Sequence, residues 1–260
     1  MTPAILCERD GAIATVTLFN PDKLNAINAA MWRQLASVMT DLSAADDLRC
    51  VIIRGEGVNF AAGGDIEEFL TERATREQAQ RYHNDWVASA LKAIAECRHP
   101  TVAAILGACV GGGLEIACAC DLRIAGESAR FGAPIMKLGF SMAPSELAGV
   151  LALAGPATTL EILLEGRLLT SAEALKKGMV TRVVSDAGLL DEAISSAQRI
   201  AAGAPLVARA HKQLVRRLMN AAASLSADEA DASFSYLESA DYAEGMAAFL
   251  AKRPPLFYGK

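Results

Sequence analysis

Hydrophobic and polar residues follow two different periods along the first part of the chain. Residues 4–19 form two β-rich arms around Asp10-Gly11, a dipeptide typical of a tight hairpin turn. Residues 25–45 then carry apolar side chains at helical spacing, and residues 49–57 form a short apolar run typical of a buried strand. The pattern therefore predicts a hairpin, a helix and a strand within the first 55 residues.

Two further cycles of loop, helix and strand follow this beginning. Their segments are a glycine loop at 59–65, a polar helical region from about Ile66 to Ala95, an apolar run at 101–110, a helix starting near Leu114, and short β-like pieces at 122–126 and 129–134. Alternation of this kind is typical of an α/β protein.

The third quarter of the chain carries a clear helix signal. Thr170 and Glu173 have the spacing of a capping box, so a helix is expected to start there, end at Gly178 and lead into a strand. After about residue 186 the β signals disappear. The remaining residues are predicted to form successive helices.

These signals predict an α/β core at residues 1–195 and a helical region at residues 196–260. Ser226 and Glu229 form a second capping-box pattern at the start of the third C-terminal helix. Short helices with apolar faces need a partner surface, either their own core or another subunit.

Composition and charge narrow the class of protein. The chain has 260 residues, 52% hydrophobic and 21% charged, which suits a globular protein with one sizeable core. A net charge of −5 argues against nucleic acid as a partner. No apolar stretch approaches the roughly 18 residues of a membrane span, and the N-terminus does not resemble a signal peptide. We expect a cytoplasmic protein whose six cysteines are reduced.

Two glycine loops stand where an apolar strand ends and a helix begins. One contains Gly63 and Gly64, and the other contains residues 111–113. Backbone N–H groups at helix starts lack helical partners, and glycine allows a ligand to approach them closely. The loops either supply two N–H donors to one developing oxyanion or only make tight turns.

Glu115 follows the second glycine loop and falls in the first turn of the expected helix. Its neighbours three and four residues later are Cys118 and Ala119, so its helix face is small and apolar. One explanation is a helix-start carboxylate that turns into solvent. The other is a general acid or base beside the oxyanion site, with its pKa raised by apolar surroundings.

Other catalytic templates fit less well. The chain has neither a P-loop nor a dinucleotide-binding glycine pattern, and residues 139–143 approach a serine-hydrolase motif but end in Ala143. Cys118 and Cys120 have no neighbouring histidine, so a metal site is not indicated. The three histidines are expected to be surface or capping residues: His83, His99 and His211.

Taken together, these motifs resemble the crotonase superfamily, the enoyl-CoA hydratase/isomerase family. The similar segments are distributed along essentially the whole chain: 20–28, 59–66, 107–125, 129–134, 166–184 and 244–257. The resemblance implies a crotonase-like spiral of repeated ββα units. It also implies a C-terminal helical oligomerisation region that forms a homotrimer or a dimer of trimers.

The resemblance also implies a substrate and a site. Members of the family bind acyl-CoA thioesters and polarise the thioester carbonyl with two backbone N–H groups, which map onto Gly64 and Gly112. Glu115 maps onto a catalytic glutamate. The family's CoA contacts map onto Lys23, Leu24, Ala62, Asp65, Ile66 and Lys252, the last of these toward the CoA phosphates. Coenzyme A is part of the substrate, so no separate cofactor and no metal are implied.

Two departures from the family pattern concern the proton chemistry. The second glutamate of the hydratases maps onto Ile135, whose side chain cannot transfer a proton, and residues 139–147 are altered as well. Glu146 is a possible replacement, although a carboxylate there is expected to be solvated. Ser141 and Ser145 could position water but are poor acids.

The expected activity is therefore that of an enoyl-CoA hydratase or hydratase-like lyase of fatty acid metabolism, which passes through an oxyanion-stabilised enolate. Alternatives on the same fold are an isomerase, a decarboxylase, a thioester hydrolase, or a non-catalytic CoA-binding or RNA-binding protein. The segment 67–85 is expected to set the size of the acyl pocket.

Overall fold

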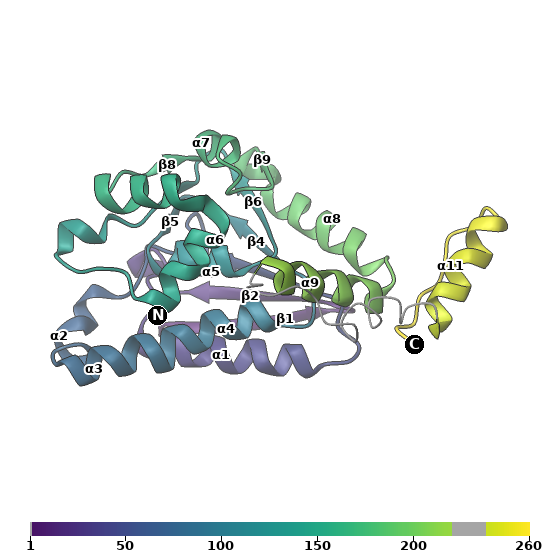
Figure 1. Ribbon diagram of the computed structural model, residues 1–260, viewed down its shortest axis with the longest axis horizontal. Helices are drawn as coiled ribbons and strands as arrows, with labels where there is room; N and C mark the ends of the chain where they lie inside the picture. The colour runs from purple at the N-terminus through teal and green to yellow at the C-terminus, as the bar shows by residue number, and fades with distance from the viewer. Residues whose placement is uncertain (1, 220–237) are drawn as a thin grey trace.

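The computed structural model describes residues 2–219 and 238–260. Figure 1 shows a sheet with helices packed around it and one helix, α11, that stands apart from the rest. The predicted capping box at Ser226 and Glu229 lies outside the described residues.

The larger sheet has six strands in the order β1-β2-β3-β4-β6-β9. Its strands are β1 (Ala4–Asp10), β2 (Ile13–Phe19), β3 (Cys50–Gly55), β4 (Thr101–Ile105), β6 (Leu122–Gly126) and β9 (Arg182–Val184). The predicted hairpin is confirmed, because β1 and β2 pair antiparallel with Asp10 opposite Ile13. The other neighbours are parallel, and β4 is buried along its whole length, as its continuous apolar sequence predicts.

A smaller three-stranded sheet lies beside the first. It contains β5 (Ala108–Val110), β7 (Arg130–Gly132) and β8 (Leu169–Thr170), in that order. An isolated bridge pairs Ala61 with Cys109, so the first glycine loop is attached to β5. This sheet therefore brings the two glycine loops to the same place.

Ten helices are present in the described parts of the chain. They are α1 (Ala29–Ala44), α2 (Phe69–Glu72), α3 (Arg76–Arg81), α4 (Ala88–Glu96), α5 (Gly112–Ala119), α6 (Pro144–Leu160), α7 (Ser171–Lys176), α8 (Leu189–Ala201), α9 (Pro205–Met219) and α11 (Ala240–Leu250). The capping box predicted for α7 is confirmed, since Thr170 and Glu173 satisfy each other's backbone N–H groups. After residue 186 the described residues form helices and no strand.

The polar region 66–95 is broken into short pieces and is not one helix. A 3-10 turn, Ile66–Glu68, precedes α2, which ends at Arg73. Helix α3 begins anew at Thr75, whose side chain caps it, and a π-helical turn joins α3 to α4. These breaks explain why the sequence of this region shows no single helical register.

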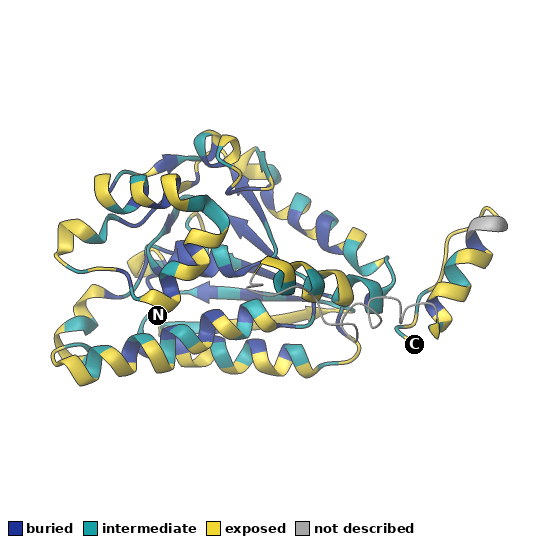
Figure 2. Ribbon diagram, viewed as in Figure 1, coloured by how far each residue is buried: buried dark blue, intermediate teal, exposed yellow. Residues whose placement is uncertain are grey.

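The core lies on both faces of the larger sheet, as the buried residues in Figure 2 show. One cluster includes Trp32, Phe60 and Phe131, all less than 2% exposed. A second cluster packs β3, β4 and β6 against α8 through side chains such as Ala193 and Ala197. The predicted boundary at residue 195 therefore falls inside a helix that is part of the core.

Helix α6 continues into a π-helical segment, and together they form a long, largely apolar stretch. By length and composition the stretch Pro144–Glu165 could cross a membrane, contrary to the expectation from the apolar pattern. Only 28% of its most apolar window is buried, and Leu160 and Leu164 are exposed. Gly155, at φ 71°, breaks the helix into two parts. A single segment of this kind is weak evidence for a membrane span.

The C-terminal helices are attached to the body through ion pairs and a returning tail. Asp121 accepts hydrogen bonds from Lys212 and Arg216 of α9, each at 2.8 Å. Helix α11 stands apart in Figure 1, and many of its residues are exposed in Figure 2. The tail after α11 returns to the body, where the Arg49 guanidinium donates to the carbonyl oxygen of Phe257.

Candidate active site

The two glycine loops are held against each other by backbone hydrogen bonds. The Ala61 N–H donates to the Ala108 carbonyl at 2.8 Å, and the Val110 N–H donates to the Ala61 carbonyl at 3.0 Å. Gly63 and Gly111 have φ values of +112° and +50°, which side-chain-bearing residues rarely adopt. Glycine at these two positions is thus required by the turns themselves.

The backbone nitrogens of Gly64 and Gly112 belong to these adjacent loops. A Cβ placed on Gly112 would lie 3.6 Å from the carbonyl carbon of Gly63, which is bonded to the Gly64 nitrogen. Gly112 is the first residue of α5, where backbone N–H groups have no helical partner. Both glycines line the same cavity. The structure thus brings together the two residues predicted as oxyanion donors.

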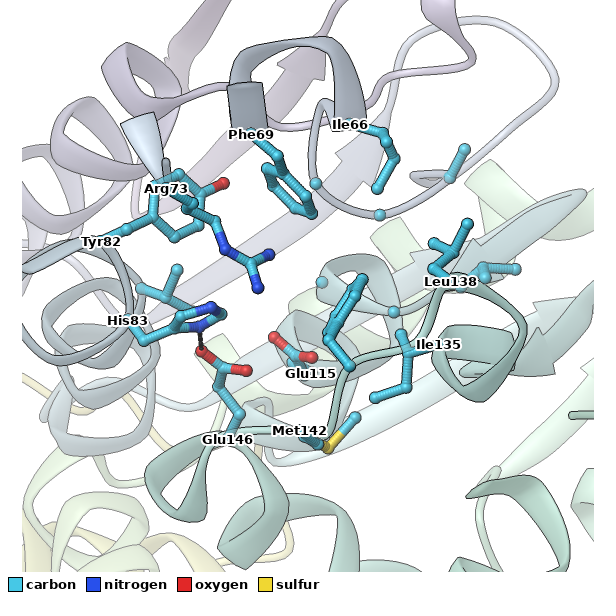
Figure 3. Close-up of a pocket in the computed structure, with 18 of the residues that line it drawn as sticks. Ile66, Phe69, Arg73, Tyr82, His83, Glu115, Ile135, Leu138, Met142 and Glu146 are labelled. Atoms are coloured by element: carbon cyan, nitrogen blue, oxygen red, sulfur yellow. Dashed lines mark hydrogen bonds and ion pairs between the residues drawn. The ribbon is translucent and has the colours of Figure 1, made fainter. Parts of the chain in front are cut away.

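A cavity of about 150 Å³ opens in front of these loops (Figure 3). Its wall is mostly apolar: Trp32, Ala62, Ile66, Phe69, Tyr82, Val87, Val110, Pro134, Ile135, Leu138, Phe140 and Met142. Four of its lining side chains are acidic or basic: Arg73, His83, Glu115 and Glu146. They come from the C-cap of α2, the π-helical turn, α5 and α6, four places that are separate in the sequence.

Glu115 is buried, with 8% of its surface exposed, and it points into this cavity in Figure 3. Burial raises the pKa of its carboxyl group well above the ordinary value, and the nearby negative charge of Glu146 raises it further. The alternative in which Glu115 turns into solvent is therefore wrong. Its position fits the predicted acid or base beside the glycine loops.

Glu146 lies in the first turn of α6 and is 4% exposed, so the expectation that it is solvated is wrong. Its Oε1 atom lies 2.5 Å from Nδ1 of His83. Pro144 occupies the first turn of α6, a position that proline favours at a helix start. That signal could have placed Glu146 on a helix, but only the tertiary structure turns it inward.

His83 also departs from its expected place on the surface. It stands in the π-helical turn Tyr82–Val87, and its side chain is 16% exposed and faces the cavity (Figure 3). His99 is fully buried elsewhere, with Nε2 3.0 Å from the Ala45 carbonyl oxygen, and burial lowers its pKa to about 4. His83 is therefore not a surface residue, whereas His99, although buried, contacts the C-cap residue of α1 and so fits the expected capping role.

Ile135 lines the cavity at the position that the family resemblance gives to a second glutamate. Ser141 is exposed and does not line this cavity. Ser145 lines a second cavity of about 660 Å³ between α4, α5, α6 and α9, which shares Glu115 and Glu146 with the first. Glu146 is therefore the one predicted substitute that reaches the glycine loops' cavity.

Five of the six predicted CoA contacts lie along one edge of the site. Lys23 Nζ donates a hydrogen bond to Asp65 Oδ2 at 2.8 Å, and this bond is the main cause of the raised pKa of Lys23. The Ala62 N–H donates to the Leu24 carbonyl at 3.0 Å, and Ile66 is 47% exposed at the cavity wall. The segments 23–24 and 62–66 thus lie side by side next to the cavity, and their role as CoA contacts stays a prediction.

The sixth predicted contact, Lys252, lies elsewhere. It follows α11, on the far side of the molecule from α2 and α3 (Figure 1). Within one chain it does not line the cavity. Its role as a phosphate contact stays a prediction.

Adding one methyl group to Gly112 or to Gly64 should affect activity to different extents. A Cβ on Gly112 would lie 2.8 Å from Trp32 Cζ2, and this ring is buried and donates to Tyr82. Because the indole cannot yield, Gly112→Ala should shift the loop and lower kcat about 10- to 100-fold, somewhat less than outright loss of an oxyanion donor.

The matched control is Gly64→Ala. Its Cβ would lie 3.2 Å from Phe69 Cζ, at the end of a side chain that can move by a few tenths of an ångström. Steady-state kinetics should show kcat within about threefold of the parent, because the backbone need not move. Equal losses in both variants would contradict this account of the two loops.

The raised pKa of Glu115 predicts a pH-dependent stability. At low pH its carboxyl is protonated in both the folded and the unfolded chain. As the pH rises past the ordinary value of 4.5, the unfolded chain releases this proton first, so stability falls up to the raised folded pKa. The variant Glu115→Gln lacks this titrating group, so its free energy of unfolding should increase relative to that of the parent as the pH rises. Urea titrations at several pH values test this, and parallel stability curves would contradict it.

Comparison with known proteins adds an independent line of information. The sequence profile described as enoyl-CoA hydratase/isomerase matches residues 8–260. The chain is 37% identical over 256 residues to the probable enoyl-CoA hydratase echA8 of Mycobacterium bovis, with 97% of each chain covered. It is 29% identical over 251 residues to the short-chain-enoyl-CoA hydratase of Clostridium acetobutylicum, with 96% of this chain and 95% of that one covered.

Solved structures show the same relationship in three dimensions. An enoyl-CoA hydratase/carnithine racemase from Magnetospirillum magneticum matches with a TM-score of 0.96 at 48% identity, covering 100% of this chain and 97% of that one. An enoyl-CoA hydratase from Bacillus anthracis matches with a TM-score of 0.91 at 26% identity, covering 98% of this chain and 99% of that one. The similarity thus includes the core and the C-terminal helices.

Proposed function

Since the chain belongs to the enoyl-CoA hydratase/isomerase family, we propose that it is a lyase that adds water to the double bond of a short enoyl-CoA. The observation that carries this proposal is the second buried carboxylate. Glu146 enters the same cavity as Glu115 and supplies the group that is absent at Ile135. With two carboxyl groups in one buried site, one can accept a proton from water while the other delivers a proton to carbon.

The two glycine amides would stabilise the negative charge that develops on the thioester oxygen. The N–H groups of Gly64 and Gly112 lie in adjacent loops at the cavity wall. Donors fixed by the fold need no rearrangement when the enolate forms, and each one can be worth about 10²- to 10³-fold in rate. This part of the site serves any reaction that passes through an acyl-CoA enolate.

The proton steps divide between the two glutamates. Glu146, oriented by His83, accepts a proton from water as the water oxygen bonds to the β carbon. The electron pair of the double bond moves onto the thioester oxygen, and protonated Glu115 then delivers its proton to the α carbon as the enolate collapses. The raised pKa of Glu115 supports its role as the proton donor. Proton exchange between the two carboxyls restores the starting state.

The size of the cavity favours a short acyl group. The cavity in front of the glycine loops has a volume of about 150 Å³, well below the ~300 to 1,000 Å³ of pockets that hold drug-sized ligands. The neighbouring cavity of about 660 Å³ shares Glu115 and Glu146 but is not lined by Gly64 or Gly112. Part of its apolar lining comes from the segment that leads into α6: Ile135, Leu138, Phe140 and Met142. An acyl chain of four or five carbons suits this space.

We further propose that the protein is cytoplasmic and works as a homotrimer or a dimer of trimers. The position of α11 apart from its own body supports assembly, because a neighbouring copy could receive it together with Lys252. Coenzyme A enters as part of the substrate, so the proposed reaction needs no separate cofactor.

A panel of 2-enoyl-CoA thioesters of increasing length tests the reaction. Turnover is followed as loss of the conjugated thioester absorbance, and we expect the highest kcat/KM at four or five carbons. If the acyl-CoAs bind and the absorbance does not change, hydration is the wrong reaction. A gain of absorbance with 3-enoyl-CoA in place of turnover of the 2-enoyl-CoAs would identify an isomerase.

A further inference from the structure

Arg73 places a cation in the cavity that the proposed hydration does not use. It is the residue that ends α2, and its side chain lines the cavity wall. In Figure 3 the guanidinium points from the side of Phe69 and Tyr82 toward the middle of the pocket, across from Glu115 and Glu146. The proton steps derived above need no positive charge at this position.

The surroundings of this guanidinium are aromatic and not anionic. Its central carbon lies 3.9 Å from the centre of the Phe69 ring and 4.6 Å from that of Phe140. In the described parts of the chain, no carboxylate oxygen forms an ion pair with it within 4.0 Å. Its Nη1 atom is buried and has no hydrogen-bond partner.

A cation without an anion is unfavourable in such a place. The guanidinium stays charged under all ordinary conditions, so it cannot escape the penalty by losing a proton. Burial lowers the pKa of Arg73, and the charge of Glu146 offsets this only in part. The ring faces compensate the charge weakly. An anionic ligand in the cavity would supply the negative partner that the protein does not provide for this guanidinium.

The two carboxylates that share this cavity do not pair with Arg73. Glu146 is hydrogen bonded to His83, and none of the ion pairs in the described residues joins Arg73 to Glu146 or Glu115. The N–H fork of arginine matches a carboxylate with two parallel hydrogen bonds. The free ligand position next to Nη1 therefore suits a carboxylate that arrives with the substrate.

We propose that Arg73 binds a carboxylate at the far end of the acyl group, so that the substrates are short acyl-CoAs that carry a second, free acid. This inference rests on the proposed function for its reaction, but not for its binding step. Nη1 of Arg73 is buried among aromatic rings, and this favours the acyl end over the CoA phosphates, because the phosphates are large and strongly hydrated.

Binding of two unreactive thioesters tests the proposal without any turnover. Glutaryl-CoA and pentanoyl-CoA have the same number of acyl carbons and differ in a terminal carboxylate or methyl group. Calorimetry on the full chain should show glutaryl-CoA binding about 10- to 100-fold more tightly, the range expected for hydrogen bonds between charged groups. A preference for pentanoyl-CoA would overturn the proposal.

The variant Arg73→Leu should abolish this preference, while binding of pentanoyl-CoA and of free CoA stays within about threefold. Arg76→Leu is the matched control, because Arg76 is exposed on α3 and its loss changes the net charge equally. It should retain the preference. Equal weakening of glutaryl-CoA, pentanoyl-CoA and CoA by Arg73→Leu would place the guanidinium on a phosphate and overturn the proposal.

A second variant covers the case in which Arg73→Leu does not fold. Arg73→Lys keeps the charge and the apolar stem but loses the fork, so it should keep only part of the preference. An unchanged preference in Arg73→Lys and Arg73→Leu would rule out Arg73 as the carboxylate ligand.

The binding test and the turnover test fail separately. If glutaryl-CoA shows an Arg73-dependent preference but the unsaturated acid glutaconyl-CoA is not hydrated, the proposed reaction is wrong and the carboxylate site stands. If crotonyl-CoA is hydrated and glutaryl-CoA has no advantage, the reaction stands and the carboxylate site is wrong.

Discussion

Replacement of Glu115 by glutamine should lower kcat for a short enoyl-CoA by about 10²- to 10⁴-fold, the usual contribution of a general acid or base. Glutamine has nearly the same shape and still fits the buried site, but it cannot deliver a proton to the α carbon. Because Glu115 faces the reacting carbons and not the rim where CoA is expected to bind, acyl-CoA affinity should change little.

The control for this experiment is an exposed glutamate. Glu96→Gln, at the end of α4, removes a charge from a side chain that is 68% exposed and distant from the cavity wall. It should leave both kcat and acyl-CoA binding unchanged. Comparable activity in Glu115→Gln and in the parent protein would remove Glu115 from the mechanism.

Glu146→Gln is expected to have the second largest effect, a loss of about 10²-fold in kcat. The substitution keeps the contact with His83 but removes the group that accepts the proton of water. It also removes the negative charge that raises the pKa of Glu115. The pKa of Glu115 should therefore fall, and the pH at which activity is lost on the alkaline side should move downward.

His83→Gln separates positioning from proton transfer. His83 contacts Glu146 and acts through it, so this variant should lose about tenfold in kcat and should shift the pH profile while keeping its shape. If Glu146→Gln leaves both the rate and the pH profile unchanged, the hydration mechanism needs another base.

Most of the fold could be predicted from local sequence patterns. The α/β class and the crotonase-like fold are confirmed by the family match and the solved structures, and the hairpin at Asp10-Gly11 and the helix capped by Thr170 stand where predicted. Hairpins and capping boxes depend on residues close together in sequence. They can therefore be predicted without knowledge of tertiary contacts.

The charged side chains that line the cavity could not all be predicted in the same way. The glycine loops and Glu115 belong to continuous motifs, whereas Arg73, His83 and Glu146 meet only after three separate elements pack together. The broken helices of residues 66–95 show no regular period, so their inward faces were not visible in the sequence. Position in the fold, and not residue type, turns Glu146 from a solvated carboxylate into a buried one.

Trp32 gives this protein a built-in optical signal. Its indole lies against Gly112 and donates to Tyr82 at 3.1 Å, so it contacts two residues of the cavity wall. The chain has only one other tryptophan, Trp86, whose ring lies under the guanidinium of Arg33. In a Trp86→Phe background all indole emission would come from beside the glycine loops. Rapid-mixing fluorescence could then record the arrival of an acyl-CoA separately from its conversion.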